Sequence, residues 1–184
     1  MTTTQTPPNH ALISAALTTE RSDLLVTLAT HRAFLLETVR GLTDEQASRR
    51  TTPSELCIGG LVKHVAATEE QWTRFILEGP SCMNFTDWSD EAVVRYADGF
   101  RLLEGETLAE VLGDYDRIAE ATDELVRTLP DLDAAHPLPQ APWWPDGGNW
   151  SARRTLLHII AEITQHAGHA DIIREALDGQ KTMG

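Results

Sequence analysis

Residues 149–179 read NWSARRTLLHIIAEITQHAGHADIIREALDG, and this stretch decides the fold of the chain. Its apolar residues recur every three or four positions, which predicts a helix with one face packed on a core. Ser151 precedes the periodic run as an N-cap, and Gly179 stands where a glycine ends a helix. The apolar positions are Leu156, Ile159, Ile160, Ile163, Ala167 and Ala170. The stretch therefore predicts one long, partly buried helix.

The same helix carries four side chains that can bind a metal ion. They are His158, Glu162, His166 and His169. At about 3.6 residues per turn, they fall within an arc of roughly 80° that borders the apolar stripe. Because residues four apart lie on one face of a helix, Glu162 and His166 can point at the same ion. Three interpretations follow: a site built on this pair, a site that includes His158 or His169, and a purely structural polar cluster.

Helical periodicity also dominates the rest of the chain. Three further segments show it, over residues 20–40, 52–79 and 106–129. In the second, Thr52, Pro53 and Glu55 form the pattern of a capping box with proline in the first turn. No stretch alternates apolar and polar residues between turns, as strands do. The sequence therefore predicts an all-α fold, a four-helix bundle.

The connections between the four expected helices are unequal. Helices one and two are joined by a short link, whereas residues 80–105 and 130–148 form long crossover loops. Within the first crossover, residues 90–96 are expected to form a short helix. The second is rich in proline, glycine and tryptophan. We expect an ordered surface loop there rather than a linker between domains.

Length and charge limit what the bundle can be. A chain of 184 residues with 41% hydrophobic content favours one domain over residues 1–184, with a core from about residue 20 to residue 179. The balance of 28 acidic against 15 basic residues gives a net charge of −13. A nucleic-acid backbone and an anionic membrane both attract basic proteins. We therefore expect neither of them as a partner.

The cysteines and the apolar runs narrow the choice further. Cys57 and Cys82 are the only cysteines, so the chain has neither a disulfide framework nor a thiolate zinc motif, and a metal must use nitrogen and oxygen ligands. No apolar run approaches the roughly 18 residues of a membrane span, and the first residues do not have the pattern of a signal peptide. A cytoplasmic location is expected.

His64, on the second expected helix, is the candidate for a third ligand. It shares a helix face with Thr68, Trp72 and several apolar residues, so we expect it to point inward. A buried imidazole without a partner costs on the order of 1–3 kcal/mol. A lone histidine on such a face is more often a core residue with a hydrogen bond, but Glu162 and His166 favour a metal site.

Two segments resemble a known family. Residues 59–72, GGLVKHVAATEEQW, and residues 156–179, LLHIIAEITQHAGHADIIREALDG, are similar to the DinB-like superfamily of metal-binding four-helix bundles. Within it they resemble the branch related to mycothiol-dependent maleylpyruvate isomerase and other thiol S-transferases. The resemblance covers residues 20–179. It implies three ligands to one divalent metal, with glutamate first and histidine second on the last helix, and it assigns them to His64, Glu162 and His166.

The resemblance also implies a function. Three protein ligands leave an open position on a zinc ion, as catalytic sites do. The expected activity is that of an S-transferase or isomerase, which activates a low-molecular-weight thiol such as mycothiol toward an electrophilic substrate. Zinc is the first choice of metal, and nickel accepts the same ligands. The alternatives are a non-catalytic metal-binding stress protein and a metal-dependent hydrolase. A homodimer is a further implication.

Other side chains are candidates for roles around the metal or on the substrate side. They are His158, His169, Thr68, Trp72 and Arg154. Trp72 and the four other tryptophans either line a cleft or pack a long loop on the bundle. Arg153 and Arg154 are interpreted either as holding a carboxylate of the thiol cofactor or as exposed residues in ion pairs. The acidic residues of the third helix are interpreted as a solvated face: Asp114, Asp116, Glu120, Asp123 and Glu124.

Overall fold

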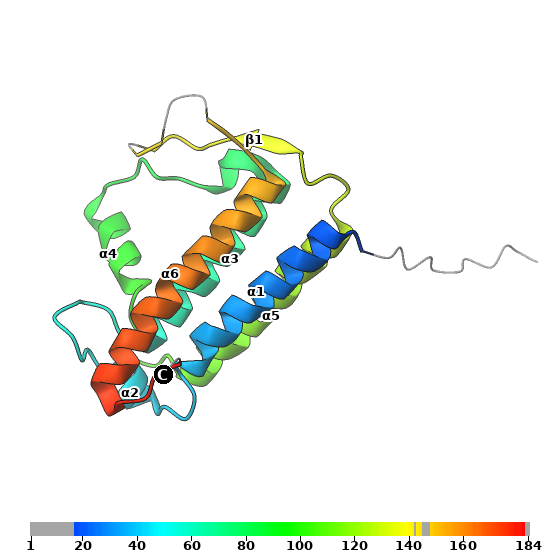
Figure 1. The fold of residues 1–184 in the computed structure, drawn as a ribbon. Coiled ribbons are helices and arrows are strands. Elements are labelled where there is room, and N and C mark those ends of the chain that lie inside the picture. Colours follow the sequence, from blue (N-terminus) through cyan, green and yellow to red (C-terminus); the bar gives the residue numbers. More distant parts are fainter. Residues whose placement is uncertain (1–16, 142, 145–147, 183–184) are drawn as a thin grey trace, which may run out of the picture.

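The computed structural model describes residues 17–141, 143–144 and 148–182, and four long helices dominate it (Figure 1). They are α1 (Thr19–Glu37), α3 (Ile58–Glu78), α5 (Leu108–Thr128) and α6 (Ala152–Asp178). Helix α6 packs against α1 and α3, and α3 also packs against α5. The predicted all-α, four-helix architecture is confirmed. None of the helices in this described part is long and apolar enough to cross a membrane.

The ends of α6 follow the predicted capping. The Ser151 hydroxyl accepts a hydrogen bond from the Arg154 amide at 3.1 Å. Gly179 ends the helix with a φ of 81°, a left-handed conformation that glycine adopts without steric cost. Helix α5 begins with a capping box that joins Thr107 and Glu110. Such caps satisfy backbone groups that a helix end leaves unpaired.

The predicted start of α3 is wrong. Residues 52–56 form a turn, in which the Ser54 hydroxyl accepts from the Leu56 amide, and Glu55 pairs with Arg50 instead of closing a capping box. The helix begins at Ile58, after Cys57. The link from α1 is also longer than predicted and holds a short helix, α2 (Asp44–Ser48).

The two crossovers contain the remaining short elements. The first holds a 3-10 turn, η1 (Gly79–Cys82), and the predicted short helix, α4 (Asp90–Asp98). In the second, strand β1 (Ala135–Pro137) pairs antiparallel with β2 (Asn149–Ser151). The sequence did not predict this pair, because strands of three residues are too short to show an alternating pattern. Residues 142 and 145–147 of the predicted surface loop lie outside the described part.

A pair of glycines in the first turn of α3 determines what covers this helix. A Cβ atom on Gly60 would lie 1.9 Å from the Phe100 carbonyl oxygen, and one on Gly59 would lie 2.6 Å from Leu102. Only glycine allows the backbone after α4 to approach so closely. As a result, the Phe100 ring lies against α3 one turn further along, beside His64.

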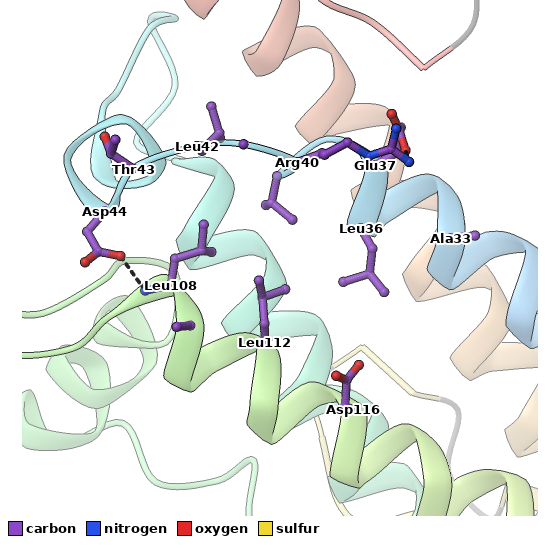
Figure 2. A pocket seen from close by; sticks show the side chains of 13 residues that line it. Ala33, Leu36, Glu37, Arg40, Leu42, Thr43, Asp44, Leu108, Leu112 and Asp116 are labelled. Atoms are coloured by element: carbon purple, nitrogen blue, oxygen red, sulfur yellow. Dashed lines mark hydrogen bonds and ion pairs between the residues drawn. The ribbon is translucent and has the colours of Figure 1, made fainter.

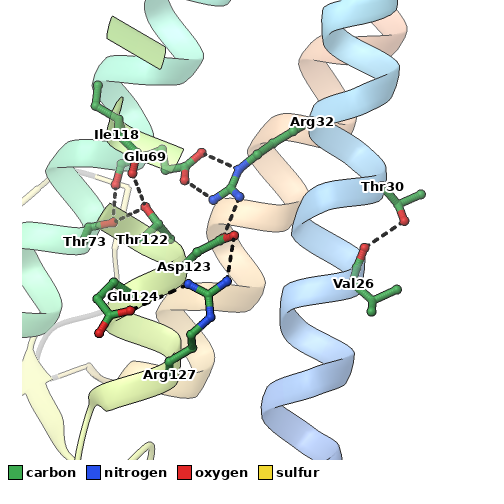
Figure 3. Close-up of polar contacts among 10 residues, drawn as sticks. All are labelled: Val26, Thr30, Arg32, Glu69, Thr73, Ile118, Thr122, Asp123, Glu124 and Arg127. Atoms are coloured by element: carbon green, nitrogen blue, oxygen red, sulfur yellow. Dashed lines mark hydrogen bonds and ion pairs between the residues drawn. The ribbon is translucent and has the colours of Figure 1, made fainter. Parts of the chain in front are cut away.

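The core contains a polar network as well as apolar side chains (Figure 3). Arg32 of α1 donates to both carboxylate oxygens of Glu69, which is 1% exposed. It also donates to Asp123 of α5 at 2.7 Å. Beside them, the hydroxyls of Thr73 and Thr122 lie 3.2 Å apart. The sequence placed Asp123 on a purely solvated face. The structure corrects this interpretation, because the Asp123 carboxylate pairs with the buried guanidinium of Arg32.

A hollow lies between helices at the other end of the α1–α5 pair (Figure 2). It has a volume of about 850 Å³ and lies between the end of α1, the link to α2 and the start of α5. Leu36 and Leu112 form part of its wall, and Asp44 accepts from the Leu108 amide at 2.8 Å beside it. None of the predicted site residues lines this hollow.

Candidate metal centre

Helices α3 and α6 bring His64, Glu162 and His166 together. One ligand atom from each residue can be chosen so that all three lie within 4.8 Å of one another. His166 Nε2 is 3.6 Å from a Glu162 carboxylate oxygen, and the rings of His64 and His166 are 4.8 Å apart in an edge-to-face arrangement. Helix α6 alone places the last two residues, whereas the packing of α3 on α6 places His64.

This cluster is partly buried, and an aromatic ring covers one of its imidazoles. The side chains of His166 and Glu162 are only 12% and 26% exposed. Phe100 stacks on His64 with ring centroids 3.9 Å apart. The Thr68 hydroxyl lies 3.5 Å from His64 Nε2, which is the limit of a hydrogen bond. Thr68 thus contacts a proposed ligand, as its place on the helix face had suggested.

The electrostatics of the cluster suit metal ligands. Burial of the ring and the nearby His166 lower the pKa of His64 to about 4, against the opposing effect of Glu162. A hydrogen bond from His166 lowers the pKa of Glu162, and the neighbouring imidazoles add to this effect while burial opposes it. Near neutral pH the site therefore offers a neutral imidazole and an ionised carboxylate. Metal ions require such deprotonated ligands.

His158 lies one turn before Glu162 and contacts it. Its Nε2 atom is 3.5 Å from the second carboxylate oxygen of Glu162. The ring meets Trp72 and Trp150 edge to face, at centroid distances of 4.8 and 4.9 Å. Burial lowers the pKa of His158, Glu162 opposes this shift, and the Arg154 charge adds to it. His158 therefore contacts a proposed metal ligand, and its supporting role stays a prediction.

His169 lies on the opposite side of the triad. Its Nδ1 atom is 3.4 Å from Nδ1 of His166, so one of these nitrogens donates to the other. His166 therefore faces Glu162 with Nε2 and His169 with Nδ1. Histidine ligands commonly use their second nitrogen in this way, and such a bond sets the tautomer and the ring orientation.

The tryptophans divide into two groups. Trp72, only 4% exposed, stacks on Trp150 at 4.9 Å and meets Trp144 edge to face at 5.8 Å. These three form an aromatic wall beside His158. Trp88 and Trp143 are 64% and 54% exposed and contact each other at 6.3 Å. This wall packs a crossover on the bundle and contacts His158, which agrees with the packing interpretation, and a cleft lined by the tryptophans stays a prediction.

The two arginines at the start of α6 and the buried cysteine before α3 have different surroundings. Arg153 forms ion pairs with Glu20 and Asp133, whereas the Arg154 guanidinium lies 4.2 Å above the Trp150 ring. Cys57 is 2% exposed, which agrees with the interpretation of a core residue. Sequence reasoning did not foresee Phe100, and the pair Gly59–Gly60 was the only local signal that another segment approaches there.

A comparison with known families covers most of the chain. The family model described as Mycothiol-S-transferase matches residues 23–179, which include the whole candidate site. Among curated proteins, no sequence matches the chain.

Proposed function

We propose a metal-dependent transfer of sulfur for this chain, which belongs to the mycothiol-S-transferase family. In this proposal, the thiol of mycothiol attacks an electrophilic carbon beside a divalent ion held by His64, Glu162 and His166. One observation carries the proposal: two helices aim three metal-binding side chains at one point, and no lysine or arginine among the described residues pairs with Glu162.

The donor set fits a divalent ion of the zinc type. Two imidazole nitrogens and one carboxylate oxygen are the ligands of catalytic zinc sites, at distances of about 2.0–2.2 Å. Ligand atoms around such an ion lie roughly 3.5 Å apart, and the 3.6 Å separation of Glu162 and His166 agrees with this. We propose zinc first and nickel second, since nickel accepts the same donors.

A divalent ion in the site would supply positive charge that favours the thiolate form of a thiol near neutral pH. In the reaction, the S–H bond breaks and a bond forms between sulfur and the electrophilic carbon. The leaving group departs with its electron pair, and the thiol proton balances its charge. His158 and His169 orient Glu162 and His166 through the contacts described above, and the Trp72 and Phe100 side chains exclude water.

Two measurements on the purified protein test the proposal. Cobalt-loaded protein should change its visible spectrum when mycothiol is added, because sulfur enters the coordination sphere. Zinc-loaded protein should accelerate the reaction of mycothiol with chlorodinitrobenzene, and the His166→Ala variant should not. A bound metal with neither effect would contradict the proposal and favour a metal-binding protein without turnover.

A further inference from the structure

Arg154 differs from the other arginines of the described residues. Each of the others forms an ion pair with a carboxylate or, in Arg21, donates to backbone carbonyls. Arg154 has no such acceptor within the described part of the chain. Its guanidinium instead lies over the Trp150 ring, 4.2 Å from the centroid. A guanidinium stacked in this way keeps its N–H edges available for a planar anion.

The position of Arg154 relates it to the metal centre. Arg154, His158 and Glu162 are spaced four apart on α6, so they follow one face of the helix. Trp150, beneath the guanidinium, contacts both Trp72 and His158, and His158 contacts Glu162. A continuous series of aromatic rings therefore leads from the Arg154 guanidinium to the proposed metal ligands. Arg154 and Glu162 are separated by eight residues, which corresponds to about 12 Å along the helix.

We propose that Arg154 binds a carboxylate of the electrophilic substrate and selects electrophiles that carry one. This inference rests on the proposed S-transfer. Mycothiol cannot supply the anion, because its cysteine is acetylated at nitrogen and joined to a sugar through an amide. The substrate class is therefore an amphiphilic carboxylate: an anionic end on Arg154, an apolar middle against the partly exposed Trp150, and a reactive carbon near the metal centre. The earlier interpretation of Arg154 as a residue for the thiol cofactor is replaced.

A matched pair of electrophiles tests the selection. The pair is para-(bromomethyl)phenylacetate and its methyl ester, which share the reactive carbon and differ in charge. We compare kcat/KM of the wild type with that of Arg154→Gln. The variant should lose about tenfold to 100-fold with the carboxylate, mainly through KM, because a hydrogen bond to a charged group is worth about 1.5–3 kcal/mol. The ester should react equally well with both proteins. Arg117→Gln, which removes the same charge from an exposed site on α5, should change neither.

A binding experiment provides a readout that does not depend on turnover. Quenching of tryptophan fluorescence in the metal-loaded protein gives the Kd of unreactive para-methylphenylacetate and of its amide. The wild type should prefer the carboxylate, and Arg154→Gln should lose this preference while keeping its melting temperature. Arg154→Lys, which keeps the charge without the planar fork, should recover part of it.

The outcomes separate the two proposals. If the wild type has the same kcat/KM for the carboxylate and for the ester, the role of Arg154 is overturned and the S-transfer proposal is left intact. The same holds if Arg154→Gln lowers kcat/KM equally for both electrophiles. If the carboxylate binds in an Arg154-dependent way but mycothiol reacts with neither electrophile, the S-transfer proposal is overturned instead. A lower melting temperature of Arg154→Gln with unchanged carboxylate binding also overturns the proposal, because it indicates that Arg154 only packs on Trp150.

Discussion

Two polar clusters lie inside this bundle, and they are built in opposite ways. In the first, Arg32 of α1 donates to Glu69 and Asp123, so every charge has a partner of opposite sign (Figure 3). In the second, between α3 and α6, the one carboxylate faces imidazoles, and burial holds the pKa of His64 at about 4. The first cluster is closed, because its charges pair with one another. The second is open, because the ligand atoms of His64, Glu162 and His166 lie close together and can bind a cation.

The difference shows how a buried polar group can be assigned to structure or to function. A paired cluster satisfies its own hydrogen bonds, and removing one member leaves a buried charge without a partner. A cluster of acceptors is satisfied by a cation from outside, and removing one member weakens the binding of that cation. The two clusters should therefore respond differently to the same kind of substitution.

The largest effect is expected in the closed cluster. Glu69→Ala should lower the free energy of unfolding by about 3–5 kcal/mol, because it leaves Arg32 buried with only Asp123 as a partner. Urea denaturation measures this loss. Glu78→Ala is the matched control on the same helix, since Glu78 forms an exposed pair with Arg74 and should cost below about 1 kcal/mol. Equal losses in the two variants would remove the distinction.

Substitutions in the open cluster should act through the metal. His64→Ala, Glu162→Ala and His166→Ala should abolish stoichiometric zinc, measured by metal analysis after dialysis. At a free zinc concentration of about 100 times Kd, the wild type should gain about 2.7 kcal/mol of stability that the variants do not gain. Gln165→Ala, at an exposed position on the same helix, should keep the metal. Full zinc content in all three variants would rule out the site.

His169 should affect affinity without affecting stoichiometry. His169→Ala removes the hydrogen bond to His166 Nδ1 and should weaken zinc binding by about 10-fold to 100-fold. Competition with a chelating dye measures the affinity. An unchanged Kd would show that His169 does not hold the ring of His166.

The pH dependence of the metal-free protein distinguishes the clusters again. The pKa of His64 is about 4 in the folded chain against an ordinary value of 6.5, and burial is the main cause. As the pH falls from 6.5 toward 4, the unfolded chain binds a proton that the folded ring does not bind. Stability due to neutral His64 is thus fully present above pH 6.5 and is lost as the pH falls toward 4. The difference between the two pKa values corresponds to about 3 kcal/mol, and solvent screening of the partly exposed ring reduces the expected loss to about 1–2 kcal/mol. Urea denaturation of the wild type and of His64→Gln should show a steeper loss in the wild type, and parallel curves would contradict this assignment.

The smallest effect concerns a hydroxyl beside the closed cluster. The Tyr115 side chain is 1% exposed, and its hydroxyl has no hydrogen-bond partner among the described residues. Burial and the nearby Glu69 raise the pKa of Tyr115, and Arg32, which lies near the hydroxyl without a hydrogen bond of normal geometry, opposes this shift. Tyr115→Phe should change the free energy of unfolding by less than about 1 kcal/mol, because it removes a buried polar group that forms no bond. A loss above about 2 kcal/mol would indicate that the hydroxyl has a partner, such as a buried water molecule.

Part of this picture was predictable because it depends on residues close in sequence. The periodicity of 156–170, the Ser151 cap and Gly179 predicted α6, and the four-residue spacing placed Glu162 beside His166. Other local predictions were wrong. The pattern from Thr52 to Glu55 has capping-box residues, but Ile58 begins α3, because the turn before it satisfies its own backbone groups.

The sequence by itself determined the all-α class, the family resemblance and a pair of ligands on one helix, because helical geometry is local and repeats every few residues. The resemblance predicted that His64 joins this pair, and the packing of α3 on α6 brings the three side chains together. Only the tertiary structure decided that Phe100 stacks on His64 and that Asp123 pairs with Arg32 instead of facing solvent. These contacts join segments that are far apart in the chain. Their geometry depends on how the helices pack, and the spacing of residues within one helix carries no information about that packing.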